Sequence, residues 1–350
     1  LLAGRAPGVQ VDRGPIICVC FDIGLKTIVA AIRDQSLADV VFVRVERGAG
    51  ELCISCHGDK AMGPAAGAHP VGGMPWPVPE ELIKEGAKVG TNPRELTCYV
   101  CHMPHGSQEH HLLVMGTESS QLCLTCHAKL RPGLWRPDLP REHPQNPPLQ
   151  TPAQKEAIRD MGTSVGANDT LICLSCHKIH HGVSDRYLLA DTLQDSRLCI
   201  RCHPERAEMK GTPHDLRVSA PDCRNRIGQT AEQSGPCGAC HTFHRYARMP
   251  DPQPHDPTGL CTTCHQADSC ASKVDFTAPG HPYNVSADQL PDNVSLHVFP
   301  RPDGQGKVIA CLTCHNPHQA TNRFFLNKPQ PQLCAECHTG MATSMSGGHE

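Results

Sequence analysis

The feature that most constrains this chain is a pentapeptide, Cys-x-x-Cys-His, that occurs nine times in 350 residues. The nine copies begin at Cys53, Cys98, Cys123, Cys173, Cys199, Cys237, Cys261, Cys311 and Cys334. This pentapeptide is the attachment sequence of c-type haem, because two thiols can bond to the porphyrin while the adjacent histidine binds the iron. We expect a chain with this many attachment sequences to fold around its porphyrins.

Zinc binding is the alternative interpretation, because Cys-x-x-Cys pairs separated by about 20 residues also form zinc ribbons. A histidine follows the second cysteine of every pair here, which a four-cysteine site does not require. An odd number of pairs would also leave one pair without a partner. Haem attachment is therefore the favoured interpretation.

Composition agrees with a haem-filled interior. The chain has 7 Phe, 2 Trp and 4 Tyr, against 30 Gly and 32 Pro. Few aromatic side chains and many helix-breaking residues leave little material for a conventional core. We expect a mostly irregular chain with short α-helices, one at each motif, and little β-sheet, wrapped around a chain of haems.

The motifs are of two kinds. In four of them, which we call leading motifs, a second histidine follows three residues after the first; the other five are trailing motifs. The leading motifs begin at Cys98, Cys173, Cys237 and Cys311. Each is followed, before the next leading motif, by one trailing motif, at Cys123, Cys199, Cys261 or Cys334, and Cys53 begins a fifth trailing motif.

This alternation predicts a two-haem repeat of about 62 to 76 residues. The chain then divides into an N-terminal segment without histidine, a half repeat with one haem, and four whole repeats with two haems each. Their predicted ranges are 1–50, 51–97, 98–172, 173–236, 237–310 and 311–350.

The chain has enough histidines for two axial ligands on every iron. Of 23 histidines, nine are proximal by position: His57, His102, His127, His177, His203, His241, His265, His315 and His338. Nine more recur in register with the repeats and are candidate distal ligands: His69, His105, His143, His180, His214, His244, His281, His318 and His349. Five remain, His110, His111, His181, His255 and His297, of which His111, His181 or His297 could replace a wrongly chosen distal ligand.

The histidine at +3 of a leading motif lies too near its own motif to reach the far face of the same haem, so we expect it to reach a neighbouring haem. The predicted thioether cysteines are Cys53, Cys56, Cys98, Cys101, Cys123, Cys126, Cys173, Cys176, Cys199, Cys202, Cys237, Cys240, Cys261, Cys264, Cys311, Cys314, Cys334 and Cys337.

On these motifs, residues 51–350 resemble multihaem c-type cytochromes of the doubled Cys-x-x-Cys-His class, which include periplasmic electron carriers and extracellular conductive filaments. The resemblance implies bis-histidine irons and haems stacked in alternating parallel and perpendicular pairs. It implies electron transfer through nine covalently bound haems, with long-range or extracellular conduction, in a polymeric filament with haem contacts between subunits. The alternative is a soluble periplasmic electron shuttle or a multihaem oxidoreductase subunit.

Enzymatic activity is not expected. A multihaem reductase needs an open iron position, and some such enzymes have lysine in place of the motif histidine. All nine motifs here end in histidine, and distal candidates are abundant. The sequence therefore favours an electron carrier.

Charge and hydropathy limit the partners and the location. The formal charge of −3 becomes about −12 with nine oxidised haems and about −21 with nine reduced ones. This favours other redox proteins or extracellular electron acceptors and argues against nucleic acid. The most apolar stretch, Ile16 to Ile32, contains Asp22 and Lys26 and is too short to span a bilayer. Covalent haem attachment is completed outside the cytoplasm, so we expect a periplasmic or extracellular protein.

Four cysteines lie outside the motifs. Cys223 and Cys270 could form a disulfide or remain free thiols. The segment from Cys18 to Ile32 resembles the small [2Fe–2S] domain of bacterioferritin-associated ferredoxins. That resemblance implies an alternative cluster held by Cys18, Cys20, Cys53 and Cys56, which would compete with the first haem; the adjacent His57 and the later His69 favour haem.

Overall fold

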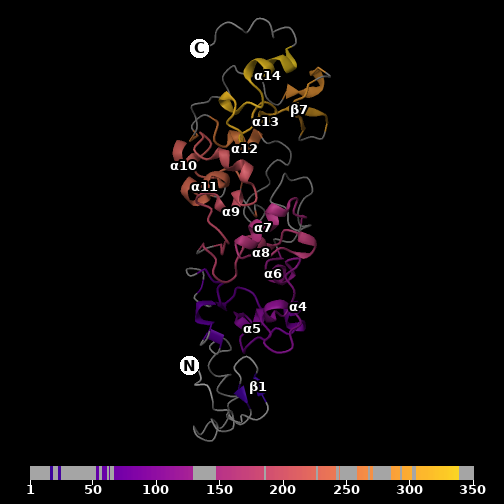
Figure 1. Ribbon diagram of the computed structural model, residues 1–350, viewed down its shortest axis with the longest axis vertical. Coiled ribbons are helices and arrows are strands. Elements are labelled where there is room, and N and C mark those ends of the chain that lie inside the picture. Colours follow the sequence, from indigo (N-terminus) through magenta and orange to yellow (C-terminus); the bar gives the residue numbers. More distant parts are fainter. Residues whose placement is uncertain are drawn as a thin grey trace.

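The computed structural model shows an elongated molecule in which the sequence advances along the longest axis (Figure 1). The half repeat lies towards one end and helix α14 towards the other. The structure describes residues 16–18, 23–24, 53–54, 57–60, 63, 67–128, 147–184, 187–225, 228–241, 244, 258–266, 269–270, 285–291, 294–301 and 305–338.

Short helices carry the motifs. In eight motifs, a helix includes at least the first cysteine: α5 (Cys98–Cys101), α6 (Gln121–Cys126), α8 (Cys173–Cys176), α9 (Arg197–Ile200), α11 (Ala231–Gly238), α12 (Thr258–Thr262), α13 (Cys311–Cys314) and α14 (Gln330–Cys337). Helices α5, α8 and α13 last one turn, because the motif histidine that follows each is extended, as at His102 with φ −114° and ψ 135°. Both cysteines lie on the helix in five of these eight motifs, and in the motifs at Cys199, Cys237 and Cys261 the second cysteine lies in the turn that follows.

The other helices in the described residues lie between motifs. They are α4 (Glu80–Lys84), α7 (Pro152–Asp160) and α10 (Leu216–Ser219), with 3-10 turns η2 (Gly58–Lys60), η4 (His110–Leu112), η6 (Ala167–Asp169), η7 (Pro204–Met209), η9 (Ala287–Gln289) and η10 (Arg323–Phe325). Helix α7 begins with a capping box, in which the Thr151 hydroxyl accepts from the Gln154 N–H, and with a proline at its first position.

Strands are short and few in the described residues. Strand β1 (Ile16–Cys18) pairs antiparallel with β2 (Ile23–Gly24), and β3 (Gly72–Gly73) pairs with β4 (Glu95–Leu96). The third sheet has the order β5 (Val285–Ser286), β7 (Lys307–Ile309), β6 (Phe299–Pro300). The predicted fold class, mostly irregular with short helices and little sheet, is confirmed.

Two small apolar clusters lie within the described part of the chain. One joins α4 and α5 through Val78, Leu82, Ala87, Leu96, Val100 and Val114. The other joins α7 and α9 through Ile158, Met161, Leu189, Ala190 and Leu198. Each cluster contains only a few side chains, and each lies across the boundary between two of the predicted ranges.

Three leading motifs share one local structure. After the one-turn helix, the motif histidine bridges to a leucine beyond the next turn, in the pairs His102–Leu113, His177–Leu189 and His315–Leu326. The residue just before that leucine in the chain has a positive φ in every case: Leu112, Leu188 and Phe325. The repeat that the sequence predicts thus recurs as the same backbone turn.

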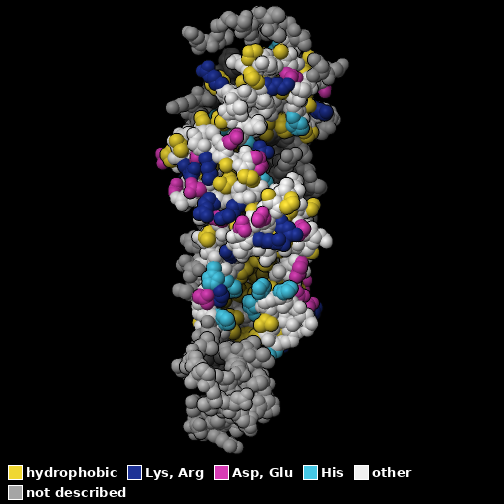
Figure 2. Space-filling view, in the orientation of Figure 1, with side chains coloured by type: hydrophobic (Ala, Val, Ile, Leu, Met, Phe, Trp, Pro, Cys, Tyr) yellow, Lys and Arg dark blue, Asp and Glu magenta, His cyan; other side chains and the backbone are white. Residues whose placement is uncertain are grey.

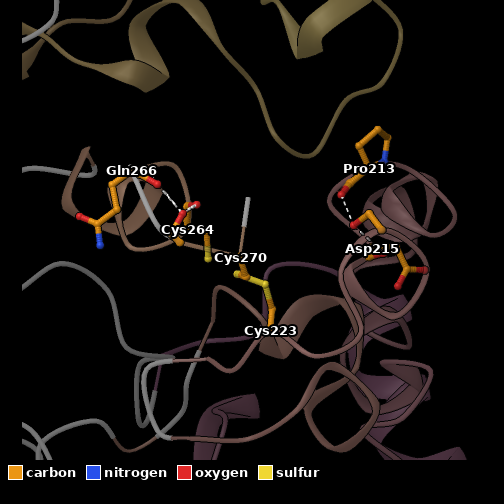
Figure 3. The surroundings of a disulfide bond; sticks show 8 residues. Pro213, Asp215, Cys223, Cys264, Gln266 and Cys270 are labelled. Carbon is orange, nitrogen blue, oxygen red and sulfur yellow. Dashed lines mark hydrogen bonds between the residues drawn. A yellow bond between two sulfur atoms is a disulfide. The ribbon is translucent and has the colours of Figure 1, made fainter. Parts of the chain in front are cut away.

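One disulfide, Cys223–Cys270, joins segments 47 residues apart, with Cα atoms separated by 5.7 Å. Of the two states that the sequence left open, the structure contains the disulfide. Figure 3 shows Cys270 close to Cys264 of a trailing motif, and Cys223 meeting it from the segment after α10. The bond therefore ties the second repeat to the third.

The helices in the described part of the chain include none long and apolar enough to cross a membrane. Of the N-terminal segment, only the backbone of the β1–β2 pair is described, so Cys20 lies outside the described residues.

Candidate haem-binding sites

The proximal histidines of three leading motifs are held in one orientation by the backbone. The Nδ1–H of His102 donates to the carbonyl of His111 at 3.0 Å. The equivalent bonds run from His177 to the Tyr187 carbonyl at 2.7 Å and from His315 to the Phe324 carbonyl at 2.8 Å. A carbonyl can only accept, so Nδ1 must carry the proton and Nε2 keeps a lone pair for a metal.

Five pairs of histidine rings face each other at nearly the same separation. The ring centres are 6.3 Å apart in His102–His180, 6.2 Å in His177–His244, 5.8 Å in His241–His318, 6.3 Å in His69–His127 and 6.2 Å in His214–His265. An imidazole nitrogen binds a metal at about 2.0 Å and lies about 1.1 Å from its ring centre, so two rings on opposite sides of one ion have centres about 6.2 Å apart. All five pairs match this spacing.

The pairing follows the repeats. Each pair joins one proximal histidine to one distal candidate. At leading motifs, the facing histidine is the +3 histidine of the next repeat, as His180 faces His102. At trailing motifs it comes from the preceding repeat, as His69 faces His127. Each of these +3 histidines therefore faces a neighbouring motif and not its own.

Backbone contacts hold the half repeat against the second repeat. The His69 N–H donates to the Ile179 carbonyl at 2.8 Å, and the Gly182 N–H donates to the Gly67 carbonyl at 2.8 Å. The Nδ1–H of His180 donates to the Lys60 carbonyl at 3.0 Å. These bonds place His69 and His180 side by side although they belong to different histidine pairs. Figure 2 shows histidine side chains gathered in this part of the molecule, beside recessed hydrophobic side chains.

The second and fourth repeats are in contact through two aromatic rings. The His214 ring stacks on the Phe325 ring with centres 4.5 Å apart. The same imidazole lies near the Pro317 carbonyl, but its buried Nδ1 makes no hydrogen bond. The fourth repeat thus packs against a distal candidate of the second.

Two buried serines join successive repeats. Ser120 and Ser196 precede the trailing motifs of α6 and α9, and both have left-handed backbone angles. The hydroxyl of Ser120 accepts from the Cys173 N–H, and that of Ser196 accepts from the Cys237 N–H, both at 2.9 Å. Sequence reasoning missed these residues, although a serine three positions before the motif in two repeats was a usable signal.

Cysteine thiols of consecutive motifs lie next to one another in sequence order. Between repeats, the first cysteines of a trailing and a leading motif are hydrogen-bonded, in the pairs Cys53–Cys98, Cys123–Cys173 and Cys199–Cys237. Within repeats, the second cysteines interact electrostatically, in the pairs Cys101–Cys126, Cys176–Cys202 and Cys314–Cys337. Each attachment site in these pairs therefore neighbours the site before or after it in the chain.

Burial raises the pKa of the Cys101 thiol to about 11 and that of Cys176 to about 12. The thiol–thiol hydrogen bond between Cys123 and Cys173 raises the pKa of Cys123 and lowers that of Cys173. The sulfurs of Cys101 and Cys176 therefore sit in surroundings suited to uncharged groups, and a thioether is uncharged.

Burial also favours the neutral form of six of these histidines. Burial lowers the imidazole pKa of His127, His177, His180, His214, His265 and His318. A metal ligand must be the neutral imidazole, so the residues present fit a bis-histidine haem iron.

Other predicted residues are not brought together or not described. His57, His105 and His315 are exposed, and no other histidine ring in the described residues faces them. The residues Cys56, His143, His255, His281 and His349 lie outside the described part, so the partners that the register predicts for His203 and His338 are not seen.

The spare histidines that are described face no proximal histidine. His110 and His111 form the turn η4, His181 lies 3.2 Å from Asp59, and His297 meets the Phe299 ring at 4.6 Å. No group of three or more Cys, His, Asp or Glu side chains in the described ranges is placed to hold a metal ion by itself.

Three segments match the family model described as Doubled CXXCH motif: residues 92–132, 165–208 and 303–343. They contain the leading and trailing motif pairs that begin at Cys98, Cys173 and Cys311. The matches indicate a multihaem c-type cytochrome, a class of electron-transfer proteins with covalently bound haem. No curated protein and no solved structure was found to match the chain.

Proposed function

We propose that this chain binds nine c-type haems, one at each motif, and that each interior iron takes one histidine from its own motif and one from an adjacent repeat. The observation that carries this proposal is the set of five histidine pairs at 5.8 to 6.3 Å. The same register assigns His143 to the motif of His203 and His281 to the motif of His338.

We include the first motif among the haem sites because of the position of Cys53. Its thiol is hydrogen-bonded to Cys98, which is the relation that Cys123 has to Cys173 and Cys199 has to Cys237. This favours haem over a [2Fe–2S] cluster at Cys18, Cys20, Cys53 and Cys56, because a cluster would draw Cys53 towards the N-terminal cysteines.

We propose that the protein conducts electrons along its length. When bound, haem supplies the one-electron iron couple, and the protein supplies position and surroundings. The chain holds successive attachment sites in sequence order along its longest axis (Figure 1). Two histidines per iron leave no position for a substrate, which supports an electron carrier rather than an enzyme. A soluble shuttle is the second candidate, since the same order would serve it.

Location and assembly follow from the same chemistry. Covalent haem and the disulfide Cys223–Cys270 both favour a compartment outside the cytoplasm, periplasmic or extracellular. The exposed proximal histidines His57 and His315, and the exposed distal candidate His105, support a homopolymer in which a second copy supplies an axial histidine. The other expected partners are redox proteins or extracellular acceptors.

Intact mass under denaturing conditions tests the haem count, because thioether bonds survive unfolding. We expect nine haem increments; eight would return Cys53 and Cys56 to the cluster interpretation.

Conduction is tested by the single-molecule current between electrodes. The wild type is compared with His244→Met, which changes an interior ligand, and with His297→Ala as a matched control. An unchanged current in His244→Met would contradict conduction through the successive haems. A high-spin signal in the optical spectrum of most of the resting protein would contradict the assignment as an electron carrier.

A further inference from the structure

The five histidine pairs fall into two geometric groups that coincide with the two kinds of motif. At leading motifs the two rings are nearly parallel, with interplanar angles of 26° for His102–His180, 26° for His177–His244 and 15° for His241–His318. At trailing motifs they are nearly perpendicular, with 74° for His69–His127 and 75° for His214–His265. None of these five pairs has an intermediate angle.

The leading-motif angle has a backbone cause. The proximal ring is fixed by its Nδ1–H bond to the carbonyl in the following turn, as at His102 and His177. The facing +3 histidine comes from an equivalent motif in the next repeat, and His180 is itself anchored on the Lys60 carbonyl. Because both rings belong to equivalent local structures, they recur at the same mutual angle.

One trailing-motif angle has a side-chain cause. The buried Nδ1 of His214 has no hydrogen-bond partner, although the ring lies beside the Pro317 carbonyl. His214 instead lies flat against Phe325, with an interplanar angle of 26° and ring centres 4.5 Å apart. A ring held parallel to Phe325 is the ring that stands at 75° to His265. Phe325, from the fourth repeat, therefore acts as a positioning residue for His214 of the second.

We propose that the chain builds two kinds of haem iron that alternate along the row, with near-parallel axial imidazoles at leading motifs and near-perpendicular ones at trailing motifs, and that Phe325 sets the perpendicular plane at the Cys261 motif. The proposal rests on the bis-histidine ligation proposed above. It concerns the planes of the axial rings and is independent of how the porphyrins stack.

The two arrangements differ electronically. Each imidazole interacts most strongly with the iron d orbital that lies perpendicular to its own plane. Parallel rings act on the same orbital and split the pair, whereas perpendicular rings act on both orbitals and leave them nearly equal in energy. In the oxidised, low-spin state, parallel rings give a rhombic electron paramagnetic resonance spectrum, and perpendicular rings give a single, strongly anisotropic feature at high g.

The test is electron paramagnetic resonance of the fully oxidised, haem-loaded protein and of single-ligand variants. We expect both signals in the wild type. His180→Met and His318→Met should each remove one iron's share of the rhombic signal, and His214→Met one iron's share of the high-g signal. His297→Ala, at an exposed histidine outside the five described pairs, should change neither. A single type of signal, or loss of high-g intensity in His180→Met, would overturn the proposal.

Failure of the underlying ligation gives a different result. If the histidine pairs do not bind iron, the optical spectrum of the resting protein is high-spin and neither low-spin signal is seen. A low-spin protein with only one signal type overturns the alternation alone.

Phe325 is tested by Phe325→Leu, with Phe325→Tyr as the conservative variant that keeps a flat ring. Phe324→Leu is the matched control, because that neighbouring ring is 60% exposed and packs under Arg323. We expect Phe325→Leu to move one iron's intensity out of the high-g feature, and Phe325→Tyr and Phe324→Leu to keep it, in proteins with full haem content and unchanged circular dichroism. An unchanged high-g feature in Phe325→Leu would show that Phe325 does not set the plane.

Discussion

Asp191 is a buried carboxylate, 5% exposed, that joins helix α9 to the segment after the leading motif at Cys173. It accepts hydrogen bonds from Arg201 at 2.6 Å and from the Thr192 N–H at 2.8 Å, and Arg197 lies 3.3 Å away. Burial acts to raise the pKa of Asp191, but these hydrogen bonds and charges outweigh it and hold the pKa below its ordinary value. The ionised form is therefore part of the folded state.

Asp191→Asn should lower the free energy of unfolding at pH 7 by about 1 to 2 kcal/mol, because the arginines lose their charged partner. The stabilisation by the ionised Asp191 carboxylate is fully present above the pKa of about 4 that it has in the unfolded chain. It is lost as the pH falls through the lower pKa of the folded state. The difference between variant and wild type should thus shrink below about pH 4, measured by denaturant titration across pH. Asp160→Asn, at an exposed position, is the control; equal stabilities at pH 7 would refute the assignment.

Gly67 has a φ of +74°, and a Cβ there would lie 2.0 Å from the Gly182 carbonyl oxygen. Gly67→Ala should therefore break the contact between the half repeat and the second repeat and move His69 away from His127. Gly228→Ala is the matched control, since Gly228 has a φ of +80° and open space around the added carbon. Left-handed strain alone costs about 1 kcal/mol, so thermal unfolding should show a larger loss for Gly67→Ala. Equal losses in the two variants would contradict this contact.

At the scale of elements, the sequence predicted a helical turn at each motif and a two-haem repeat, because the attachment sequence fixes cysteine spacing. It could not predict the anchoring carbonyls of His111, Tyr187 and Phe324, because any residue supplies a carbonyl and only the left-handed turn aims it. Nor could spacing show which repeat supplies each facing histidine. That depends on contacts such as Gly67 with Gly182, between segments far apart in the sequence.

Ser120 and Ser196, which precede α6 and α9, each connect two successive repeats through one hydrogen bond. Ser120→Ala removes the hydroxyl that accepts from the Cys173 N–H. Ser120 is only 3% exposed, so water cannot readily replace that acceptor. We expect a loss of about 1 to 2 kcal/mol in unfolding free energy, and a similar loss for Ser196→Ala. Ser119→Ala, next in the chain but exposed, should change stability less. Wild-type stability in both buried variants would show that these bonds do not hold the repeats together.

The disulfide should stabilise the junction of the second and third repeats. Cys223 follows His214 and Cys270 follows His265, so the bond links the segments that carry one facing histidine pair (Figure 3). Its removal in Cys223→Ser with Cys270→Ser should cost up to about 4 kcal/mol, from the loop it closes. Denaturant titration of the haem-loaded protein measures the change, and the optical spectrum shows whether the low-spin fraction falls. An unchanged midpoint would mean that packing alone holds this junction.

At the scale of the whole molecule, adjacent repeats supply facing histidines to each other. The second and third repeats show both directions, with His244 facing His177 and His214 facing His265. In the described residues, buried apolar packing is limited to two small clusters, one between the half repeat and the first repeat and one between the first and second repeats. Iron binding to both members of a pair would therefore be the main link between repeats, so folding along the long axis should depend on haem.

The most direct test of this account is a high-resolution structure of the haem-loaded protein, with irons located by their anomalous scattering. We expect one iron between His102 and His180, one between His177 and His244, and one between His69 and His127, with the nine irons following sequence order along the molecule. Irons bound by the two histidines of a single leading motif, such as His177 with His180, or a spatial order that departs from the sequence, would contradict the account.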